Sequence, residues 1–317
     1  MTQILELSAE EQQDVFGGHD RYIRRIENDL GVQVLSRDGV ISVRGSSDNV
    51  RKAVGIIRQL AGLSDKGTAI EEHSVSYALE MKDEKKTDDM LLAIDGDVIC
   101  HTAMGRPVKP KTLGQKNYID AIRRNLIVFA NGPAGTGKTY LAMAMAITAF
   151  QNKEVERIIL TRPAIEAGEK LGFLPGDLQS KVDPYLRPLY DALFQIMGAE
   201  NFQRNVERGL IEVAPLAYMR GRTLDNSYII LDEAQNTTPE QMKMFLTRLG
   251  FNSKMVITGD ITQIDLPDNK RSGLVEAVKI LKNIEDIAIT RFSEKDVVRH
   301  KLVQDIVKAY EKFSENK

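Results

Sequence analysis

The chain has 317 residues, of which 42% are hydrophobic and 28% charged, and its formal net charge is −2 at pH 7. This length suits one large domain with a smaller one. The composition excludes a protein stabilised by internal disulfides, because Cys100 is the only cysteine. It also excludes a membrane-spanning protein, because no apolar window is long enough to cross a bilayer. The nearly balanced charge does not indicate nucleic-acid binding, so any such binding would depend on local clusters of Lys and Arg.

The N-terminus begins a small folded domain rather than a signal peptide, because it is acidic and lacks a basic start and an apolar centre. With a single thiol in the chain, this predicts a reduced, cytoplasmic protein with no membrane contact. The strand ILEL is followed by the turn VFGGHD and by the helix RYIRRIENDLG, whose Ile23, Ile26 and Leu30 lie at helical spacing. Two strands, VQVLS and VISVRG, form a hairpin around RDG, and Asp48 is expected to cap a second helix.

This order of strand, helix, hairpin and helix over residues 1–62 resembles a KH-type RNA-binding domain. KH domains clamp a nucleic-acid backbone with a GxxG loop. The corresponding turn here, Gly17-Gly18-His19-Asp20, lacks the second glycine of that pattern. Basic residues of the turn and the following helix could still contact phosphates: His19, Arg21, Arg24 and Arg25. The alternative is a capping turn followed by a solvated helix face, and both interpretations stay open.

Residues 63–110 predict a segment that connects two domains. The run MKDEKKTDD is a mixed-charge patch, typical of a linker or a solvated helix surface. The following ICHTAMGRPVKPKTLGQ is basic and punctuated by Pro and Gly, so we expect a join rather than a core element. Cys100 and His101 are too few ligands for a closed zinc site, so a structural or loop role is expected for both.

From residue 111 to 317, short apolar runs alternate with longer helical patterns. The candidate strands are LIVFA, RIILT, LIEVA, YIILD, KMVIT and DIAIT. Continuous apolarity of this kind is typical of a parallel sheet that is covered on both faces. In such a sheet, a ligand is expected at the carboxyl ends of the strands. The predicted fold class of this region is therefore α/β with a parallel sheet, preceded by the small α+β domain that resembles a KH domain.

The sequence NGPAGTGKTY follows the first of these strands and fits the P-loop pattern G-x-x-x-x-G-K-[ST]. Its glycines let backbone N–H groups curl around phosphate oxygens, Lys138 places an ammonium on the same oxygens, and the Thr139 hydroxyl ligates Mg²⁺. The helix that follows, TYLAMAMAITAF, directs its N-terminal dipole at the anion. The predicted nucleotide-binding residues of the loop are Gly132, Pro133, Ala134, Gly135, Thr136, Gly137, Lys138 and Thr139.

Two further strand ends carry polar residues that suit the same site. YIILDEAQ brings Asp232 to a strand end, where it can hold Mg²⁺, and the next residue, Glu233, is a natural base or water-orienting group for hydrolysis. VITGDITQ ends in Asp260 and Gln263, which can sense a γ-phosphate, because an amide both donates to phosphate and accepts from water. Lys138, Glu233 and Gln263 are therefore the predicted catalytic residues within this core.

The motifs resemble two known groups of proteins. LDEAQ followed by TGDITQ is similar to motifs II and III of superfamily 1 helicases, and ILTRPA to their motif Ia, a strand end that touches nucleic-acid backbone. TLGQKNYIDAI resembles their Q motif, in which Gln115 would read the adenine edge. More closely, the set RPVKPKTLGQ, GPAGTGKT, TRPAIEAGEKLGFLPGDLQ, RGRT, LDEAQNTT and GDITQIDLP resembles the PhoH-like ATPase family, from about Arg106 to the C-terminus.

That resemblance implies a RecA-like P-loop NTPase core, ATP and Mg²⁺ as cofactors and RNA as a partner. The KH-like front end matches one branch of the family. It also implies a ribosomal RNA maturation endonuclease as a partner, whereas nothing in these residues speaks to regulation by phosphate starvation.

Rival enzyme classes fit less well. A GTPase should carry an N/T-K-x-D motif, and the nearest string, NKRSG, lacks the aspartate. A small-molecule kinase has no use for Glu233 beside Asp232, because activating water would waste ATP. The sequence therefore predicts an ATPase that binds or remodels RNA, with strand separation by an RNA helicase as the second hypothesis. An ATPase that remodels proteins or signals, without strand separation, stays open as the alternative.

The residues after Lys111 have room for one RecA-like core, whereas a superfamily 1 helicase supplies an arginine to ATP from a second core. We therefore expect a neighbouring subunit to supply it within a ring, most simply a homo-hexamer. Arg291, directly after the last strand, is preferred for this role over Arg299. Arg220 and Arg222 could instead face a neighbour's phosphate or the nucleic acid.

The segment from Arg162 to Leu193 is basic, rich in Gly and Pro, and interleaved with aromatic residues. Such a stretch can follow a single strand through phosphate contacts and base stacking. Arg162, Lys170 and Arg187 are the candidate nucleic-acid contacts. A contact between subunits explains the same composition equally well.

Overall fold

A computed structural model of the chain describes residues 1–37, 39–65, 70, 72–80, 97–163, 178–267 and 269–299, with 302, 303, 306, 307, 309, 310 and 313 near the C-terminus. The chain forms two compact units. The first contains Met1–Asp97, Lys111–Leu113 and Val298–Lys317, and the second contains Val98–Pro110 and Gly114–Val297.

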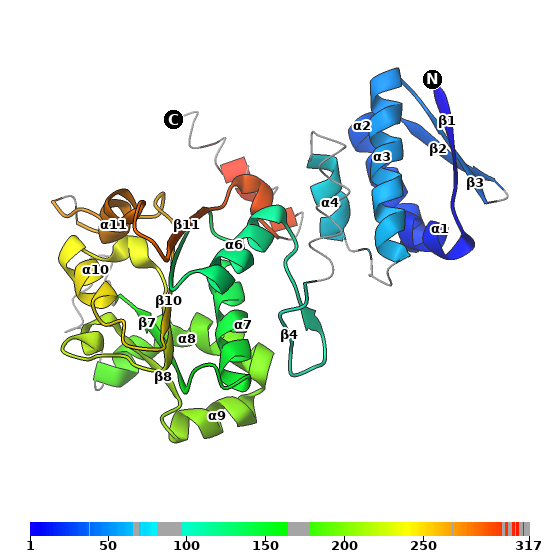
Figure 1. The fold of residues 1–317 in the computed structure, drawn as a ribbon. Coiled ribbons are helices and arrows are strands. Elements are labelled where there is room, and N and C mark those ends of the chain that lie inside the picture. The colour runs from blue at the N-terminus through cyan, green and yellow to red at the C-terminus, as the bar shows by residue number, and fades with distance from the viewer. Residues whose placement is uncertain are drawn as a thin grey trace. The chain divides into compact units, whose positions relative to one another are not determined.

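In its described residues, the N-terminal unit combines an antiparallel sheet with helices (Figure 1). The strands β1 (Thr2–Glu6), β2 (Gln33–Arg37) and β3 (Val40–Arg44) lie in the order β1-β3-β2. The helices are α1 (Ala9–Phe16), α2 (Arg21–Leu30), α3 (Ser47–Ser64) and α4 (Glu72–Glu80), and the turn Gly18–Asp20 between α1 and α2 is a single 3₁₀ turn.

Helix caps account for two differences from the sequence-based expectations in this unit. Helix α1 was not predicted, and it starts at a capping box in which Ser8 and Glu11 satisfy each other's backbone N–H groups. Helix α3 is capped by Ser46, whose hydroxyl accepts from the Asn49 N–H, so the expected cap at Asp48 is wrong. Asp48 instead lies in the first turn of α3.

One hydrophobic core joins the sheet and the helices of the N-terminal unit. Ile41 and Val43 of β3 pack in a cluster with Ile26 of α2 and with Ile57 and Leu60 of α3, and all five are fully buried. The strand buries alternate residues, as expected for a sheet with one face on the core. The small α+β domain that the sequence predicts is therefore present, and its three-stranded antiparallel sheet is compatible with a KH-like arrangement.

The second unit is built on a six-stranded parallel sheet in the order β11-β6-β10-β9-β7-β8. All six predicted apolar runs form these strands: β6 (Ile127–Asn131), β7 (Arg157–Arg162), β8 (Ile211–Pro215), β9 (Ser227–Leu231), β10 (Lys254–Gly259) and β11 (Ile287–Arg291). The predicted α/β class with a RecA-like P-loop core is confirmed.

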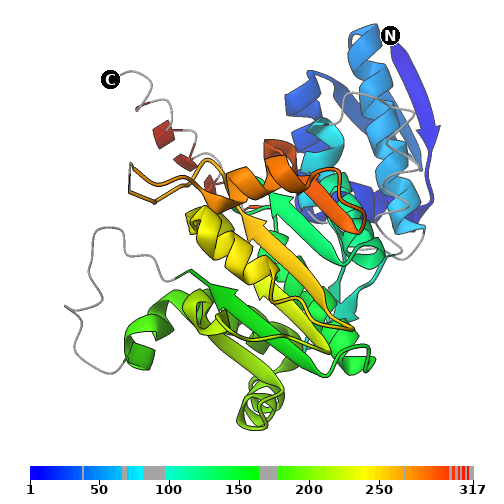
Figure 2. The same ribbon diagram turned by 60° about the vertical axis from the view of Figure 1, so that its left-hand side comes forward.

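Helices cover both faces of this sheet (Figures 1 and 2). Successive residues of β9 divide between two hydrophobic cores, with Tyr228 and Ile230 in one and Ile229 and Leu231 in the other. Burial on both faces is the reason that these strands read as continuous apolar runs. The first core is covered by α6 (Leu113–Arg124), α7 (Lys138–Gln151), α8 (Leu178–Met197) and α9 (Ala199–Glu207), and the second by α10 (Pro239–Leu246) and α11 (Gly273–Leu281).

Part of the expected connection belongs to this unit. Strand β4 (Cys100–His101) pairs antiparallel with β5 (Pro107–Val108). Ile99 and Val108 are buried in the same core as the residues of α7, so this stretch is a core element rather than a join. Burial also raises the pKa of the Cys100 thiol. The mixed-charge run at 81–89 lies outside the described residues.

Short 3₁₀ turns at Leu216–Met219, Ala234–Asn236 and Glu294–Asp296 complete the second unit. Within the described ranges, every helix is too short or too polar to cross a bilayer.

Candidate functional site

The P-loop joins β6 to α7 at the carboxyl edge of the sheet. Its glycines Gly132, Gly135 and Gly137 have positive φ values of 155°, 85° and 77°. At Gly132 a side chain would collide with Phe292, because an added Cβ would lie 2.7 Å from the Phe292 carbonyl oxygen. Gly137 is the N-cap of α7 in a left-handed conformation, which favours glycine. The loop therefore turns tightly onto the N-terminus of a helix, where an anion is stabilised.

Lys138 is the first residue of α7, and its ammonium turns back into the P-loop. It donates to the carbonyl oxygens of Gly132 and Pro133, both at 2.7 Å, and to Thr136 Oγ1 at 3.2 Å. The Lys138 carbonyl accepts from the buried Tyr118 hydroxyl at 3.2 Å. The cation thus lies within the loop that would hold phosphates, which is the place that its predicted role requires.

Thr139 and Asp232 meet at this edge although they are far apart in the sequence. Thr139 Oγ1 donates to Asp232 Oδ1 at 2.6 Å, and Thr258 Oγ1 donates to the same oxygen at 2.7 Å. The three residues come together because β10, which carries Thr258, lies between β6 and β9. Hydroxyl and carboxylate oxygens are ligands that Mg²⁺ prefers, so Thr139 and Asp232 fit the metal of a bound nucleotide.

Glu233 follows Asp232 in a left-handed conformation, with φ 51°. This conformation is costly for a residue with a side chain, so the surrounding structure must hold it. Both carboxylate oxygens have partners: Oε1 lies 3.4 Å from a guanidinium nitrogen of Arg162, and Oε2 accepts from Gln235 Nε2 at 2.6 Å. Arg162 also lies 4.0 Å from Asp232 Oδ2.

Asp260 and Gln263 lie in the turn that follows β10. Asp260 Oδ1 accepts from the Thr262 N–H at 2.9 Å and from its hydroxyl at 2.7 Å, and Asp260 Oδ2 accepts from Gln263 Nε2 at 2.8 Å. Asp260 therefore organises its own turn and holds the Gln263 amide. The expected contacts of both residues with nucleotide stay predictions.

Gln115 is buried beside the P-loop. Its Nε2 donates to the Thr136 carbonyl at 3.0 Å and lies close to Gly137, where an added Cβ would come within 3.2 Å of it. Gln115 therefore supports the loop from behind, and its predicted reading of adenine stays a prediction.

The arginines proposed from the sequence are spread over several places. Arg162, a candidate nucleic-acid contact, has its guanidinium at Asp232 and Glu233, and its contact with nucleic acid stays a prediction. Arg291 is exposed at the end of β11, in register with Asn131, which precedes the P-loop. Arg222 makes two hydrogen bonds with Glu212, at 2.6 and 2.7 Å, which raise the pKa of its guanidinium.

The remaining candidates lie in other elements of the chain or outside the described residues. Arg187 is an exposed residue of α8, and Arg220 is exposed after the 3₁₀ turn Leu216–Met219. Arg299 has no regular secondary structure, so its expected place in a helix is wrong. Lys170 lies outside the described residues.

Sequence reasoning assigned no role to several residues that build this site. Gln235 contacts Glu233, and Thr258 contacts Asp232. Tyr118 and Phe292 stack edge to face, with ring centroids 5.3 Å apart, behind the P-loop. A polar residue in a buried strand end, as at Thr258, is a usable signal, whereas the packing of Phe292 against Gly132 depends on β11 lying beside β6.

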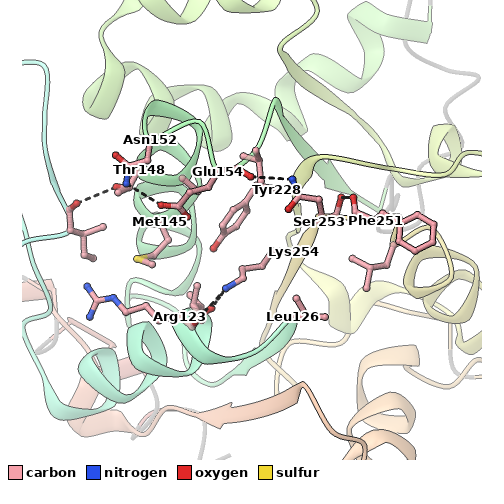
Figure 3. A pocket seen from close by; sticks show the side chains of 17 residues that line it. Arg123, Leu126, Met145, Thr148, Asn152, Glu154, Tyr228, Phe251, Ser253 and Lys254 are labelled. Carbon is pink, nitrogen blue, oxygen red and sulfur yellow. Dashed lines mark hydrogen bonds between the residues drawn. The ribbon is translucent and has the colours of Figure 1, made fainter.

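A cavity of about 590 Å³ opens at the opposite, amino-terminal edge of the same sheet (Figure 3). Lys254 lines it and donates to the Ile122 carbonyl near the end of α6, and burial lowers the pKa of its ammonium. The Tyr228 hydroxyl is buried and has no hydrogen-bond partner among the described residues. Burial keeps this phenol protonated by raising its pKa far above the ordinary value.

Comparisons with known proteins agree with this geometry. The family model described as PhoH-like protein matches residues 107–311. A PhoH-like protein of Bacillus subtilis (strain 168) is 51% identical over 305 residues, which cover 96% of this chain and 95% of that protein. A PhoH-like protein of Mycobacterium tuberculosis (strain ATCC 25618 / H37Rv) is 51% identical over 301 residues, 95% of this chain and 85% of that protein.

Among solved structures, the Sulfolobus solfataricus SWI2/SNF2 ATPase core in complex with dsDNA is 13% identical to this chain and has a TM-score of 0.32. The match covers 57% of this chain and 44% of that one. The family match and the near full-length relatives decide the assignment. This chain therefore belongs to the PhoH-like family, with the P-loop core of a nucleotide-hydrolysing ATPase.

Proposed function

We propose that this protein is a Mg²⁺-dependent ATPase that couples hydrolysis to the binding or remodelling of RNA. ATPase activity is supported most directly by the 2.6 Å hydrogen bond from the Thr139 hydroxyl of the P-loop to the Asp232 carboxylate, with Glu233 as the next residue. A structural turn has no need for this combination. A phosphate loop, a metal-binding pair and a base at one sheet edge are the parts that phosphoryl transfer to water requires.

In the proposed reaction, each residue has a separate task. The Lys138 ammonium exchanges the loop carbonyls for oxygens of the β- and γ-phosphates. Thr139 and Asp232 hold Mg²⁺, which neutralises phosphate charge when it is bound. Glu233 accepts the proton of the attacking water, and Gln263 orients that water at the γ-phosphate. The bond between the γ-phosphorus and the bridging oxygen breaks, so ADP leaves with that oxygen. ATP, rather than GTP, is the expected substrate because the chain lacks a guanine-reading motif.

RNA is the proposed partner because of the KH-like unit. In its turn between α1 and α2, His19 and Asp20 have positive φ values of 58° and 59°, and His19 is exposed. Arg25 is paired with Asp29 and Glu72, at 3.8 and 3.5 Å, and Arg21 lies over the Tyr22 ring at 4.6 Å. Arg24, exposed on the same helix, has no partner among the described residues and is the arginine best placed to contact phosphate.

The test is steady-state ATP turnover with Mg²⁺, with and without single-stranded RNA. RNA should stimulate the wild type, and Arg24→Glu should reduce that stimulation while leaving RNA-independent turnover intact. Arg58→Glu, a charge reversal at an exposed position of α3, is the matched control. Turnover indifferent to RNA would favour an ATPase that remodels proteins or signals. Because ATP and RNA are both present in the cytoplasm, we propose that the protein works there.

We also propose that the active sites are completed between subunits of a ring, most simply a hexamer, with Arg291 as the arginine donated to the neighbour. Arg291→Ala should then reduce turnover by roughly 10³-fold. Mixing Arg291→Ala with Lys138→Ala subunits is the sharper test. In a mixed ring, an intact P-loop meets an intact arginine, so activity should partly return. No recovery in mixed rings, verified as hexamers by light scattering, would contradict donation between subunits.

A further inference from the structure

We propose that Gln235 is the residue that positions the carboxylate of Glu233 and links it to the turn carrying Gln263. This inference rests on the proposed ATPase function and adds a positioning residue to it. Gln235 lies in the 3₁₀ turn Ala234–Asn236 directly after Glu233, and only 1% of it is exposed. A glutamine that is almost fully buried must have its amide satisfied, so its partners show what it holds in place.

The amide of Gln235 makes three hydrogen bonds, each to a part of the candidate active site. Nε2 donates to Glu233 Oε2 at 2.6 Å and to the Gln263 carbonyl at 3.1 Å. Oε1 accepts from the Asp260 N–H at 3.0 Å. One side chain therefore connects the end of β9 with the turn that follows β10.

The orientation of this amide is specified by chemistry. Rotating it by half a turn would place Oε1 against the Glu233 carboxylate and the Gln263 carbonyl, which only accept, and Nε2 against the Asp260 N–H, which only donates. Only the observed orientation satisfies all three partners. The donated hydrogen bond to Glu233 is charge-assisted, which makes it the strongest of the three.

Gly259 leaves the room that the Gln235 amide occupies. At Gly259 an added Cβ would lie 2.8 Å from Gln235 Oε1 and 2.6 Å from Leu274 Cδ2. Any side chain at the last residue of β10 would therefore displace the amide. Gly259 has an ordinary φ, so close packing rather than backbone conformation accounts for glycine at this position.

The connection gives Gln235 a consequence for catalysis. Gln263 Nε2 and the Thr262 hydroxyl both donate to the Asp260 carboxylate, and the Asp260 N–H donates to Gln235 Oε1. We therefore expect the turn and the Gln235 amide to shift together. When Gln263 changes partners to face a nucleotide, the shift reaches Glu233 through Gln235. Glu233 would then be aimed at the attacking water only when the turn is in its nucleotide-bound arrangement.

The test measures kcat and KM for ATP, with ATP affinity from a fluorescent analogue. Gln235→Ala should reduce kcat by roughly 10- to 100-fold, because a base misplaced by about 1 Å loses about that much, and should leave ATP affinity within about 3-fold. Gln203→Ala is the matched control, since it removes a glutamine that donates to Glu207 on α9, outside the site. It should not change kcat.

A double substitution separates positioning from general structural damage. In a Glu233→Gln background, Gln235→Ala should cost no more than about a further 3-fold, because a residue that acts through Glu233 has nothing left to position. Full additivity, or wild-type kcat for Gln235→Ala, would overturn the inference. A wild type without ATP turnover would instead overturn the proposed function.

If Gln235→Ala fails to fold, Gln235→Glu keeps the shape and the acceptor for Asp260 but replaces the donor with a second carboxylate at Glu233. Gln235→Glu should reduce kcat at least as much as the reduction expected for Gln235→Ala. An unchanged kcat in this variant would equally overturn the inference.

Discussion

The two edges of the six-stranded sheet carry opposite kinds of polar chemistry. At the carboxyl edge, Asp232, Glu233 and Asp260 are each engaged by hydrogen-bond donors or cations from neighbouring strands and turns. At the amino edge, the polar groups of the cavity serve the fold: Lys254 binds the Ile122 carbonyl, and the Tyr228 hydroxyl has no partner among the described residues. Strand β9 runs from one edge to the other, with Tyr228 near its start and Asp232 just past its end.

The difference indicates that the carboxyl edge is better suited to chemistry than the cavity at the amino edge. Catalysis needs charges that are fixed before the substrate arrives, and hydrogen-bond networks from several strand ends fix them. At the cavity of the amino edge, Lys254, Ser253 and Thr148 instead donate to backbone carbonyl oxygens. Substitutions at the carboxyl edge should therefore change turnover, and substitutions at the amino edge should change only stability.

The largest effect is expected for Lys138→Ala at the carboxyl edge. Removing the ammonium takes away the cation that should neutralise the transferring phosphate, so kcat should fall by roughly 10³-fold or more. Turnover measured by phosphate release is the assay, with Lys279→Ala on the exposed face of α11 as a control. Retention of the wild-type rate would disprove the assignment of the P-loop.

Glu233→Gln should have the next largest effect, and a more selective one. The variant keeps the metal ligand Asp232, so it should bind ATP with nearly wild-type affinity. It loses the base, so kcat should fall by roughly 10²- to 10³-fold. Equilibrium binding of a fluorescent ATP analogue and single-turnover hydrolysis separate the two quantities. Lost affinity with little change in the rate of bound ATP would make Glu233 a binding residue instead.

Most of the second unit could be predicted from the sequence, because a buried strand and a P-loop are each recognisable from a few consecutive residues. The six strands, the P-loop and the strand ends at Asp232 and Asp260 were all found in this way. What the sequence did not predict depends on strand order. The contacts of Arg162 with Glu233 and of Thr258 with Asp232 require β7 and β10 to flank β9, and apolar patterns do not encode that order.

A smaller effect is expected for Thr258→Val, which removes one donor to Asp232 while nearly keeping the shape of the side chain. Partners of a metal ligand typically contribute 10- to 100-fold in metal affinity, so the Mg²⁺ concentration for half-maximal turnover should rise by roughly 10-fold. Thr161→Val is a close control, because the Thr161 hydroxyl at the neighbouring strand end is buried without a partner among the described residues. Equal Mg²⁺ requirements for the two variants would contradict the role of Thr258.

The smallest effects are expected for substitutions of two buried tyrosines, one at each edge of the sheet. They test the contrast between the two edges directly. Tyr228→Phe at the amino edge removes a hydroxyl without a partner among the described residues, so stability should stay the same or rise by up to about 1 kcal/mol. Tyr118→Phe at the carboxyl edge removes the hydroxyl that donates to the Lys138 carbonyl, so stability should fall by about 1 kcal/mol.

For a unit of this size, these changes correspond to opposite shifts of about 2–4 °C in the unfolding midpoint, which calorimetry resolves. Only Tyr118→Phe should lower ATP turnover, because only its hydroxyl contacts the P-loop. A clear loss of stability in Tyr228→Phe would mean that this hydroxyl binds a group in the cavity. The amino edge would then hold a polar site of its own, and the contrast between the two edges would fail.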